Sequence, residues 1–189
     1  MRASFRFDPP FNMPSVVVNR RAVASRGQAT TLQWVLWLVL FGAVAMCYWP
    51  GLSGAFVFDD DVNILENTAL RIQSLNGAEM WAAAWSGHAG PLGRPVSLLT
   101  FALNHYFSGF DPFTFKLVNL LIHLGNTALI GALAQCLCVA MSEQQAVTLK
   151  PKWVQQIAGW MVAALWALHP LNLTSVLYVV QRMTSLSAL

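Results

Sequence analysis

Residues 32–49 read LQWVLWLVLFGAVAMCYW, an apolar run with tryptophan near both ends that decides the class of this fold. An α-helix needs roughly 20 mainly apolar residues to cross the hydrocarbon core of a bilayer. Aromatic residues at both ends are typical of the two membrane interfaces, and Pro50 with Gly51 predicts the end of the helix. The run is longer than the apolar core of a secretory signal peptide and lacks a small-x-small cleavage site. We therefore interpret residues 31–49 as a retained transmembrane helix.

Two further stretches without charged residues lie between Lys116 and Glu143 and between Lys152 and Arg182. They predict a second transmembrane helix at 113–141 and a third at 153–168, which His169-Pro170 ends. Three polar residues interrupt the second helix near its start: Asn119, His123 and Asn126. Another apolar stretch begins at Thr184, so we expect residues 184–189 to start a fourth helix.

The composition of the whole chain favours the same class of protein. Hydrophobic residues make up 56% of the sequence and charged residues 10%, whereas a soluble domain has about a quarter of charged residues. Buried helices of a large soluble protein are the alternative, but such helices rarely lack charge on every face. We therefore predict an all-α membrane protein, built as a polytopic helical bundle.

The placement of lysine and arginine predicts the orientation of the chain. Residues 1–30 carry five arginines and one acid, residues 142–152 carry Lys150 and Lys152, and residues 50–112 carry six acids and two arginines. Positive residues stay in the cytoplasm. We therefore expect a basic cytoplasmic arm at 1–30, an external loop at 50–112, a cytoplasmic loop at 142–152 and an external amphipathic segment at 169–183. No basic patch interleaves with aromatic residues, so nucleic acid is not an expected partner.

Candidate chemistry begins directly after the first predicted span, where residues 56–63 read FVFDDDVN. Three carboxylates in a row repel one another unless a cation or a hydrogen-bond donor intervenes. One of them can act as a general base on a hydroxyl acceptor, or hold a divalent cation against a phosphate. The alternative is a solvated acidic turn that caps the next helix, because aspartate favours helix N-caps.

A second candidate lies further along the same loop, where residues 87–101 read GHAGPLGRPVSLLTF. Glycine and proline predict a loop, and Pro95 predicts the first residue of a helix. This helix places Ser97 and Thr100 on one face and Leu98 and Phe101 on the other, so we expect it to lie in the membrane interface. Arg94 at its start can bind a lipid phosphate through two hydrogen bonds; an ordinary surface arginine is the alternative.

The third candidate follows the third predicted span, where residues 169–183 read HPLNLTSVLYVVQRM. The pattern predicts a helix from about Leu171, with Ser175, Tyr178 and Arg182 on one side. His169 and Arg182 then lie on the same outer side of the membrane as the aspartates. For His169 alone, a cap on the end of a helix is the alternative.

Four blocks of sequence together resemble the N-terminal part of a membrane glycosyltransferase family of the GT-C type. In the family's order they read FVFDDDVNILEN, GPLGRPVSLLTFALNHYF, FKLVNLLIHLGNTALI and ALHPLNLTSVLYVVQRMTSLSAL. The chain is similar to the bacterial relatives of the transmembrane and tetratricopeptide-repeat O-mannosyltransferases. The resemblance implies a GT-C fold with an outer loop that carries interfacial helices. It also implies transfer of a sugar from a polyprenyl-phosphate donor to a hydroxyl group of a protein or lipid acceptor at the outer face of the bacterial inner membrane.

The resemblance also implies roles for individual residues. Asp59 and Asp60 match the catalytic acidic pair, while Arg94, His169 and Arg182 match residues that would bind the donor phosphate or substrate. Thr174 stands where many relatives have an acidic residue, which removes one carboxylate that a divalent cation would use. Because family members have many more spans, we expect the N-terminal part of a larger enzyme, inactive alone. A non-catalytic membrane subunit or scaffold is the alternative.

Overall fold

The computed structural model describes residues 20–87, 93–144 and 152–189. The described backbone is helical and contains no strand, which confirms the all-α class. Most of the predicted basic arm and most of the predicted 142–152 loop lie outside these residues. So does the middle of the glycine-rich loop before Arg94.

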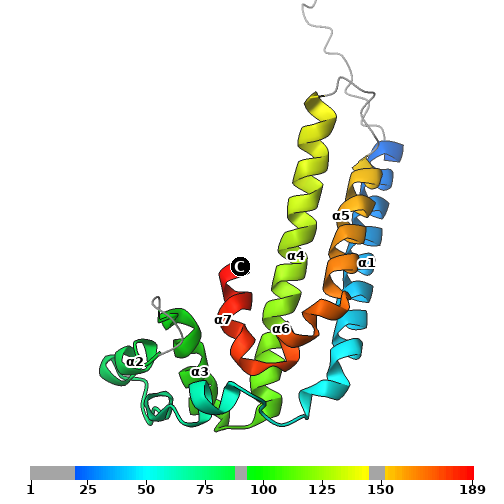
Figure 1. The fold of residues 1–189 in the computed structure, drawn as a ribbon. Coiled ribbons are helices and arrows are strands. Elements are labelled where there is room, and N and C mark those ends of the chain that lie inside the picture. Colours follow the sequence, from blue (N-terminus) through cyan, green and yellow to red (C-terminus); the bar gives the residue numbers. More distant parts are fainter. Residues whose placement is uncertain (1–19, 88–92, 145–151) are drawn as a thin grey trace, which may run out of the picture.

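Three long helices form the bundle: α1 (Arg20–Leu52), α4 (Pro112–Gln144) and α5 (Lys152–Ala167). In Figure 1, α1 and α5 run downward. The helix α4, which comes between them in the sequence, runs upward. Within α1 and α4, Thr31–Leu52 and Pro112–Met141 are long and apolar enough to cross a membrane, with mean hydropathies of 1.8 and 1.6. The helix α1 begins at Arg20, upstream of the span predicted from residue 31.

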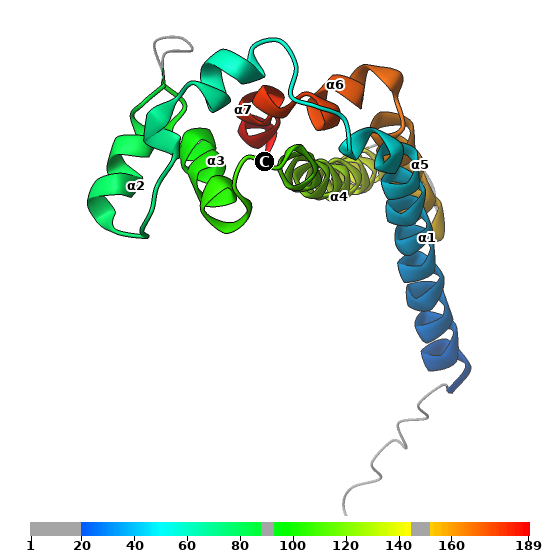
Figure 2. The ribbon, with the colours of Figure 1, turned by 90° about the horizontal axis from the view of Figure 1, so that it is seen from below.

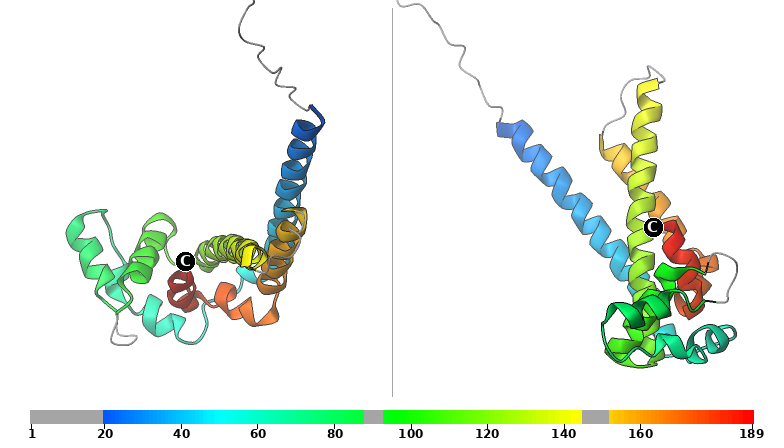
Figure 3. Two further views of the ribbon diagram at one scale, coloured as in Figure 1. Left: turned by 90° about the horizontal axis from the view of Figure 1, so that it is seen from above. Right: turned by 90° about the vertical axis from the view of Figure 1, so that its left-hand side faces the viewer.

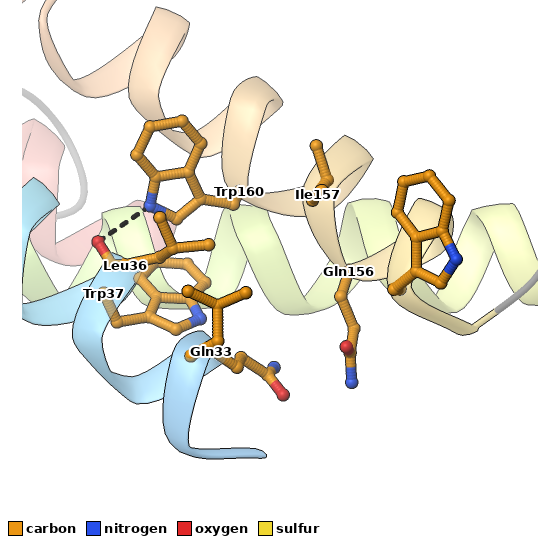
Figure 4. Close-up of a pocket in the computed structure, with 8 residues that line it drawn as sticks. Gln33, Leu36, Trp37, Gln156, Ile157 and Trp160 are labelled. Carbon is orange, nitrogen blue, oxygen red and sulfur yellow. Dashed lines mark hydrogen bonds between the residues drawn. The ribbon is translucent and has the colours of Figure 1, made fainter. Parts of the chain in front are cut away.

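At the lower end of the bundle, α4, α5 and the last turns of α1 pack against one another. Its core consists of Leu40, Val44, Tyr48, Leu52, Leu120, Ala163, Ala167 and Val176. Toward the upper end α1 diverges from α4, as the right-hand view of Figure 3 shows. A pocket between α1 and α5 is lined by Trp37 and Trp160, and the indole N–H of Trp160 donates to the Leu36 carbonyl at 2.9 Å (Figure 4).

The loop between α1 and α4 folds into a small helical unit beside the lower end of α4 (Figures 1 and 2). It contains the π-helix η1 (Asp61–Leu65), the 3-10 helix η2 (Thr68–Leu70), α2 (Gly77–Ala84) and α3 (Pro95–Ser108). A separate core holds the unit together and joins it to α4 and the C-terminal segment: Ile64, Leu70, Ile72, Ala83, Leu98, Phe101, Ala102, Phe115, Val179 and Met183.

The helix predicted from Pro95 is present as α3, but its surroundings differ from the expectation. Leu98 and Phe101, on the face expected to enter the membrane, are buried in the core of the loop unit. Ser97, on the face expected to meet water, is also buried. The reason is that α7 (Arg182–Ser185) lies between α3 and α4 (Figure 2) and covers α3 on that side.

The segment after α5 is not the single helix that the sequence predicted. It consists of η3 (Pro170–Asn172), α6 (Leu173–Leu177), η4 (Val179–Gln181), α7 and η5 (Leu186–Ala188). The chain bends by 57° between Trp153–Ala167 and Pro170–Leu177, and this bent pair is long and apolar enough to count as a third span. Pro170 favours the break because it has no N–H to continue the helix.

Polar residues on one face of α4 bind backbone carbonyl groups of this broken segment and of the end of α5. Asn119 donates to the carbonyls of Val176, Tyr178 and Val179 at 3.2–3.4 Å. His123 pairs with the Ala167 carbonyl at 3.0 Å, and Asn126 donates to the Ser185 carbonyl at 2.9 Å. Irregular backbone at membrane depth is tolerated only where protein groups satisfy it. The polar residues that interrupt the second predicted span therefore stabilise the broken segment beside it.

Candidate functional site

The acidic triplet lies at the lower end of the bundle, between the last turn of α1 and η1 (Figure 1). The chain turns sharply there, because Phe58 has a φ of 52°, in the left-handed region. The turn separates the three carboxylates. Asp59 and Asp61 are exposed to solvent, whereas Asp60 is fully buried.

The carboxylate of Asp60 joins the start of the loop to the C-terminal segment. Its Oδ2 accepts hydrogen bonds from the N–H groups of Val57 at 3.1 Å and Val179 at 3.4 Å. Its Oδ1 accepts from the N–H of Val180 at 2.7 Å. Burial raises the pKa of Asp60, while these N–H groups and the positive charge of Lys116 act to lower it. The buried side chain of Asp60 therefore links the loop to the C-terminal segment. It does not cap the helix that follows, because it makes no cap hydrogen bond to η1.

Lys116, in the first turns of α4, supplies the positive charge near this carboxylate. Its Nζ donates to the carbonyls of Gly54 at 2.8 Å and Ala55 at 3.0 Å, and the side chain is almost fully buried. The ammonium group thus fixes the chain between α1 and the triplet. In the sequence, Lys116 serves only to delimit an apolar stretch; a lysine at the start of a transmembrane helix was the available signal.

Asp59 faces outward and pairs with Tyr178, the residue between α6 and η4. The backbone N–H of Asp59 donates to the Tyr178 hydroxyl at 3.1 Å. Loss of solvent around the hydroxyl raises the pKa of Tyr178; the hydrogen bond from the Asp59 N–H acts to lower it, and the negative charges of Asp59 and Asp60 act to raise it further. The rings of Phe58 and Tyr178 meet edge to face, with centroids 6.1 Å apart. The sequence analysis placed Tyr178 on a helix face with Arg182 but gave it no role in the site.

Arg94 lies immediately before α3 and is exposed. Its backbone has a φ of 48°, and its Nη1 lies 3.6 Å from the sulfur of Met183 in α7. Left-handed backbone costs a residue other than glycine about 1–3 kcal/mol, and such residues concentrate at functional sites. Phe58 and Arg94 are the residues other than glycine with positive φ in the described ranges. Phe58 directly precedes Asp59, a candidate for the chemistry. Arg94 is itself the candidate for phosphate binding.

Arg182, in contrast, is completely buried between α3 and α4. Its Nε donates to Asn119 at 2.7 Å, its Nη1 contacts both oxygens of Thr100, and its Nη2 donates to Asn104 at 3.0 Å and to the Phe115 carbonyl at 2.7 Å. The guanidinium also stacks over the Phe101 ring at 4.5 Å. Burial lowers the pKa of Arg182 to about 9. All of its nitrogens bind protein, so this geometry favours a structural role over the predicted contact with a phosphate.

His169 is exposed at the junction between α5 and η3. Its Nδ1 accepts a hydrogen bond from the backbone N–H of Leu171 at 3.2 Å. The ring therefore has the geometry of the helix-end cap that the sequence analysis named as an alternative. Its other nitrogen is not used by this contact.

The candidate residues other than His169 form one connected site around the segment from Tyr178 to Met183. Asp59 and Asp60 contact its beginning, Arg94 contacts its end, and Arg182 holds it against α3 and α4. His169 lies upstream of α6, and in the described part of the chain its ring is hydrogen-bonded to Leu171 and not to these groups. Within the same part, no three His, Cys, Asp or Glu side chains are grouped to hold a metal ion.

Comparison with known proteins gives one consistent group of relatives. The human protein O-mannosyl-transferase TMTC4 is 31% identical over 161 residues, which are 80% of this chain and 21% of the relative. The human protein O-mannosyl-transferase TMTC3 is 27% identical over 80% of this chain and 15% of its own length. The protein O-mannosyl-transferase Tmtc2 of Drosophila melanogaster is 32% identical over 71% of this chain and 13% of its own. This chain thus spans about a fifth or less of these relatives. No family model matches it, and no solved structure does.

Proposed function

We propose, from the relationship of this chain to the protein O-mannosyl-transferases, that it forms one end of the active site of a membrane glycosyltransferase. The reaction moves a sugar, by analogy with the relatives a mannose, from a polyprenyl-phosphate donor to a hydroxyl group of a protein acceptor. The observation that carries the proposal is the contrast within the acidic pair. The carboxylate of Asp60 is buried and bound by backbone N–H groups, whereas Asp59 is exposed and its backbone N–H is bound by the Tyr178 hydroxyl.

In this proposal Asp59 is the general base. Its carboxylate takes the proton from the acceptor hydroxyl, whose oxygen forms a bond to the anomeric carbon of the sugar. The bond from that carbon to the phosphate oxygen breaks, and the electron pair leaves with the polyprenyl phosphate. A positioned base of this kind contributes about 10²–10⁴ in rate. Tyr178 orients Asp59 through the hydrogen bond between its hydroxyl and the Asp59 N–H.

Asp60 has a different role, although it belongs to the same pair. Its three backbone hydrogen bonds fix the turn that presents Asp59. They also offset the left-handed conformation of Phe58, which costs about 1–3 kcal/mol. We therefore assign Asp60 as a positioning residue.

Arg94 is the residue best suited to the donor phosphate. Its guanidinium is exposed, it is always charged at neutral pH, and it can form two parallel hydrogen bonds to phosphate oxygens. The exposed edge of His169 can add a second donor where the substrate reaches α5. Arg182 fixes α7, whose Met183 contacts Arg94.

A divalent cation does not fit the acidic pair. Both oxygens of Asp60 face N–H donors, which a cation would have to displace. That leaves Asp59 as one exposed ligand, whereas magnesium and calcium take several oxygen ligands. No step of the proposed reaction therefore passes through a metal.

The orientation of the chain is part of the same proposal. The positive residues before the apolar span Thr31–Leu52 of α1 favour a cytoplasmic N-terminus, which puts the lower end of Figure 1 at the outer face of the membrane. If the host is a bacterium, as the sequence resemblance implies, this membrane is the inner membrane.

The experiment that tests the proposal is sugar transfer from a polyprenyl-phosphate donor by the complete protein in purified membranes. Asp59→Asn should lower kcat by about 10²–10⁴ while protein level and melting temperature stay unchanged. Asp61→Asn, the neighbouring exposed carboxylate, is the matched control and should keep near-parental turnover. Near-parental turnover of Asp59→Asn would remove the general base from this loop.

A further inference from the structure

Phe58, the residue directly before Asp59, keeps its aromatic ring outside the protein. The side chain is 83% exposed, more than any other large apolar side chain in the described part of the chain. Its backbone has a φ of 52°, a conformation that is rare for a bulky residue. Strain of this kind concentrates at functional sites, and here no burial of the ring accounts for it.

Tyr178 holds this ring beside the candidate base. The rings of Phe58 and Tyr178 meet edge to face, with centroids 6.1 Å apart and planes at 77°. The Tyr178 hydroxyl accepts the backbone N–H of Asp59 at 3.1 Å. Loss of solvent raises the pKa of that hydroxyl, and the nearby negative charge of Asp59 acts in the same direction. The Phe58 ring and the Asp59 carboxylate therefore border the same tyrosine, and one face of the Phe58 ring stays uncovered.

The proposed sugar transfer, on which this inference rests, develops positive charge at this place. The acceptor hydroxyl gives its proton to Asp59, and its oxygen bonds to the anomeric carbon. The electron pair of the old bond leaves with the polyprenyl phosphate. When the old bond breaks ahead of the new one, positive charge spreads over the anomeric carbon and the ring oxygen, as in the oxocarbenium-like transition state of glycoside hydrolysis.

The reach of the two side chains brings this charge to the aromatic ring. A general base lies about 3 Å from the oxygen whose proton it takes, and the anomeric carbon is one bond further on. The Cα atoms of Phe58 and Asp59 are consecutive, so they lie about 3.8 Å apart. The face of an aromatic ring carries partial negative charge and attracts a cation within about 6 Å of its centroid.

We propose that the uncovered face of Phe58 lies against the anomeric centre of the donor sugar and stabilises the positive charge that develops there. The ring forms no bond and takes no proton, so the balance of the reaction is unchanged. Phe58 is then a substrate-binding residue whose contact strengthens in the transition state. The strained turn would serve two purposes, because it presents both the base and the aromatic ring to the sugar.

The test changes the electrons of the ring while keeping its shape and apolar character. Phenylalanine analogues with one, two and three ring fluorines are introduced at Phe58 of the complete protein by nonsense suppression, since each fluorine withdraws negative charge from the ring face. Phe107, which is 76% exposed on α3 and contacts the Tyr106 ring, is the matched control. Sugar transfer from polyprenyl-phosphate mannose is measured in purified membranes, together with protein level and melting temperature.

We expect kcat to fall stepwise with each fluorine at Phe58, while the donor KM and the melting temperature hold. Phe58→Leu, which keeps an apolar side chain without an aromatic face, should lower kcat by about 3- to 30-fold. The analogues at Phe107 should leave kcat unchanged.

Equal kcat across the series at Phe58 is the result for a ring that only contacts lipid, and it would overturn the proposal. A raised donor KM with constant kcat would show ordinary contact with the bound sugar and would overturn it equally. The general base is decided separately by Asp59→Asn. Near-parental turnover in that variant would remove the base, whereas the fluorine series reports the charge on the sugar whichever group takes the proton.

Discussion

The Oδ1 atom of Asp60 lies 2.7 Å from the backbone nitrogen of Val180, a residue 120 positions further along the chain. This hydrogen bond closes the candidate site, because it joins the loop after α1 to the short helices after α5. The same carboxylate binds Val179 and Val57. Asp60, which matches one member of the catalytic pair, thus binds backbone N–H groups. Its neighbour Asp59 stays accessible to a substrate.

Replacing Asp60 with asparagine should damage the structure, in contrast to the same change at Asp59. Asparagine keeps one acceptor oxygen but turns an N–H₂ group toward backbone N–H donors. Each buried donor left without a partner costs about 1–3 kcal/mol. We expect Asp60→Asn to lower the melting temperature of the detergent-solubilised protein and to speed proteolysis of the 53–60 segment. An unchanged melting temperature would argue against the positioning role and would return Asp60 to the list of direct catalysts.

The tyrosine that contacts Asp59 gives a milder test of the same turn. Tyr178→Phe removes the hydroxyl that accepts the Asp59 N–H but keeps the ring contact with Phe58. A net hydrogen bond contributes about 0.5–1.5 kcal/mol, so kcat should fall by up to about tenfold. The melting temperature and the donor KM should stay close to parental values. Equal kcat for Tyr178→Phe and the parent would show that this hydroxyl does not position the base.

Much of the fold could be predicted from the sequence, because charge-free stretches of this length have few other uses. The apolar spans Thr31–Leu52 in α1 and Pro112–Met141 in α4 overlap the runs from which helices were predicted. The break at His169-Pro170 was predicted, but the breaks further along could not be, since residues 171–182 keep the apolar pattern of a helix. The helix ends at Tyr178 because Asp60 binds the next N–H groups and Asn119 binds the carbonyls. Both partners are distant in sequence, and no local signal in 171–182 reports them.

The sequence singled out Asp59, Asp60, Arg94 and Arg182 as candidates, but it could not show which of these side chains are buried and which are exposed. Three consecutive aspartates look alike in sequence, and only the left-handed turn at Phe58 decides that Asp60 points inward. The two arginines likewise carry the same charge beside apolar residues. Packing of α7 between α3 and α4 buries Arg182 and leaves Arg94 exposed. The polar residues Thr100, Asn104 and Asn119 were the available signal, because they face Arg182 inside otherwise apolar helices.

Glu79 gives a prediction about pH. Hydrogen bonds from the Ser74 hydroxyl and from the N–H groups of Gln73 and Ser74 lower its pKa from the ordinary 4.5 to about 2. Because the pKa is lower in the folded state, the stabilisation is complete above about pH 4.5 and is lost as the pH falls toward 2. Amide exchange of α2, corrected for intrinsic rates, should therefore lose protection between these values. In Glu79→Gln this pH dependence should disappear; a parental profile in that variant would assign the effect to another group.

The two arginines provide the final prediction, because the structure separates residues that the sequence treated alike. Arg94→Gln removes an exposed charge, so the melting temperature should hold while the KM for the polyprenyl-phosphate donor rises. Arg182→Lys keeps the charge but cannot reach the acceptors on Asn104, Asn119 and Phe115 together. Each buried acceptor left unpaired costs about 1–3 kcal/mol, so this conservative change should lower the melting temperature or the yield of folded protein. The measurements are thermal unfolding in detergent and donor-dependent kinetics on the same preparations. A stable Arg182→Lys protein with a raised donor KM would show that Arg182 binds the phosphate after all, and a parental donor KM in Arg94→Gln would remove Arg94 from the donor site.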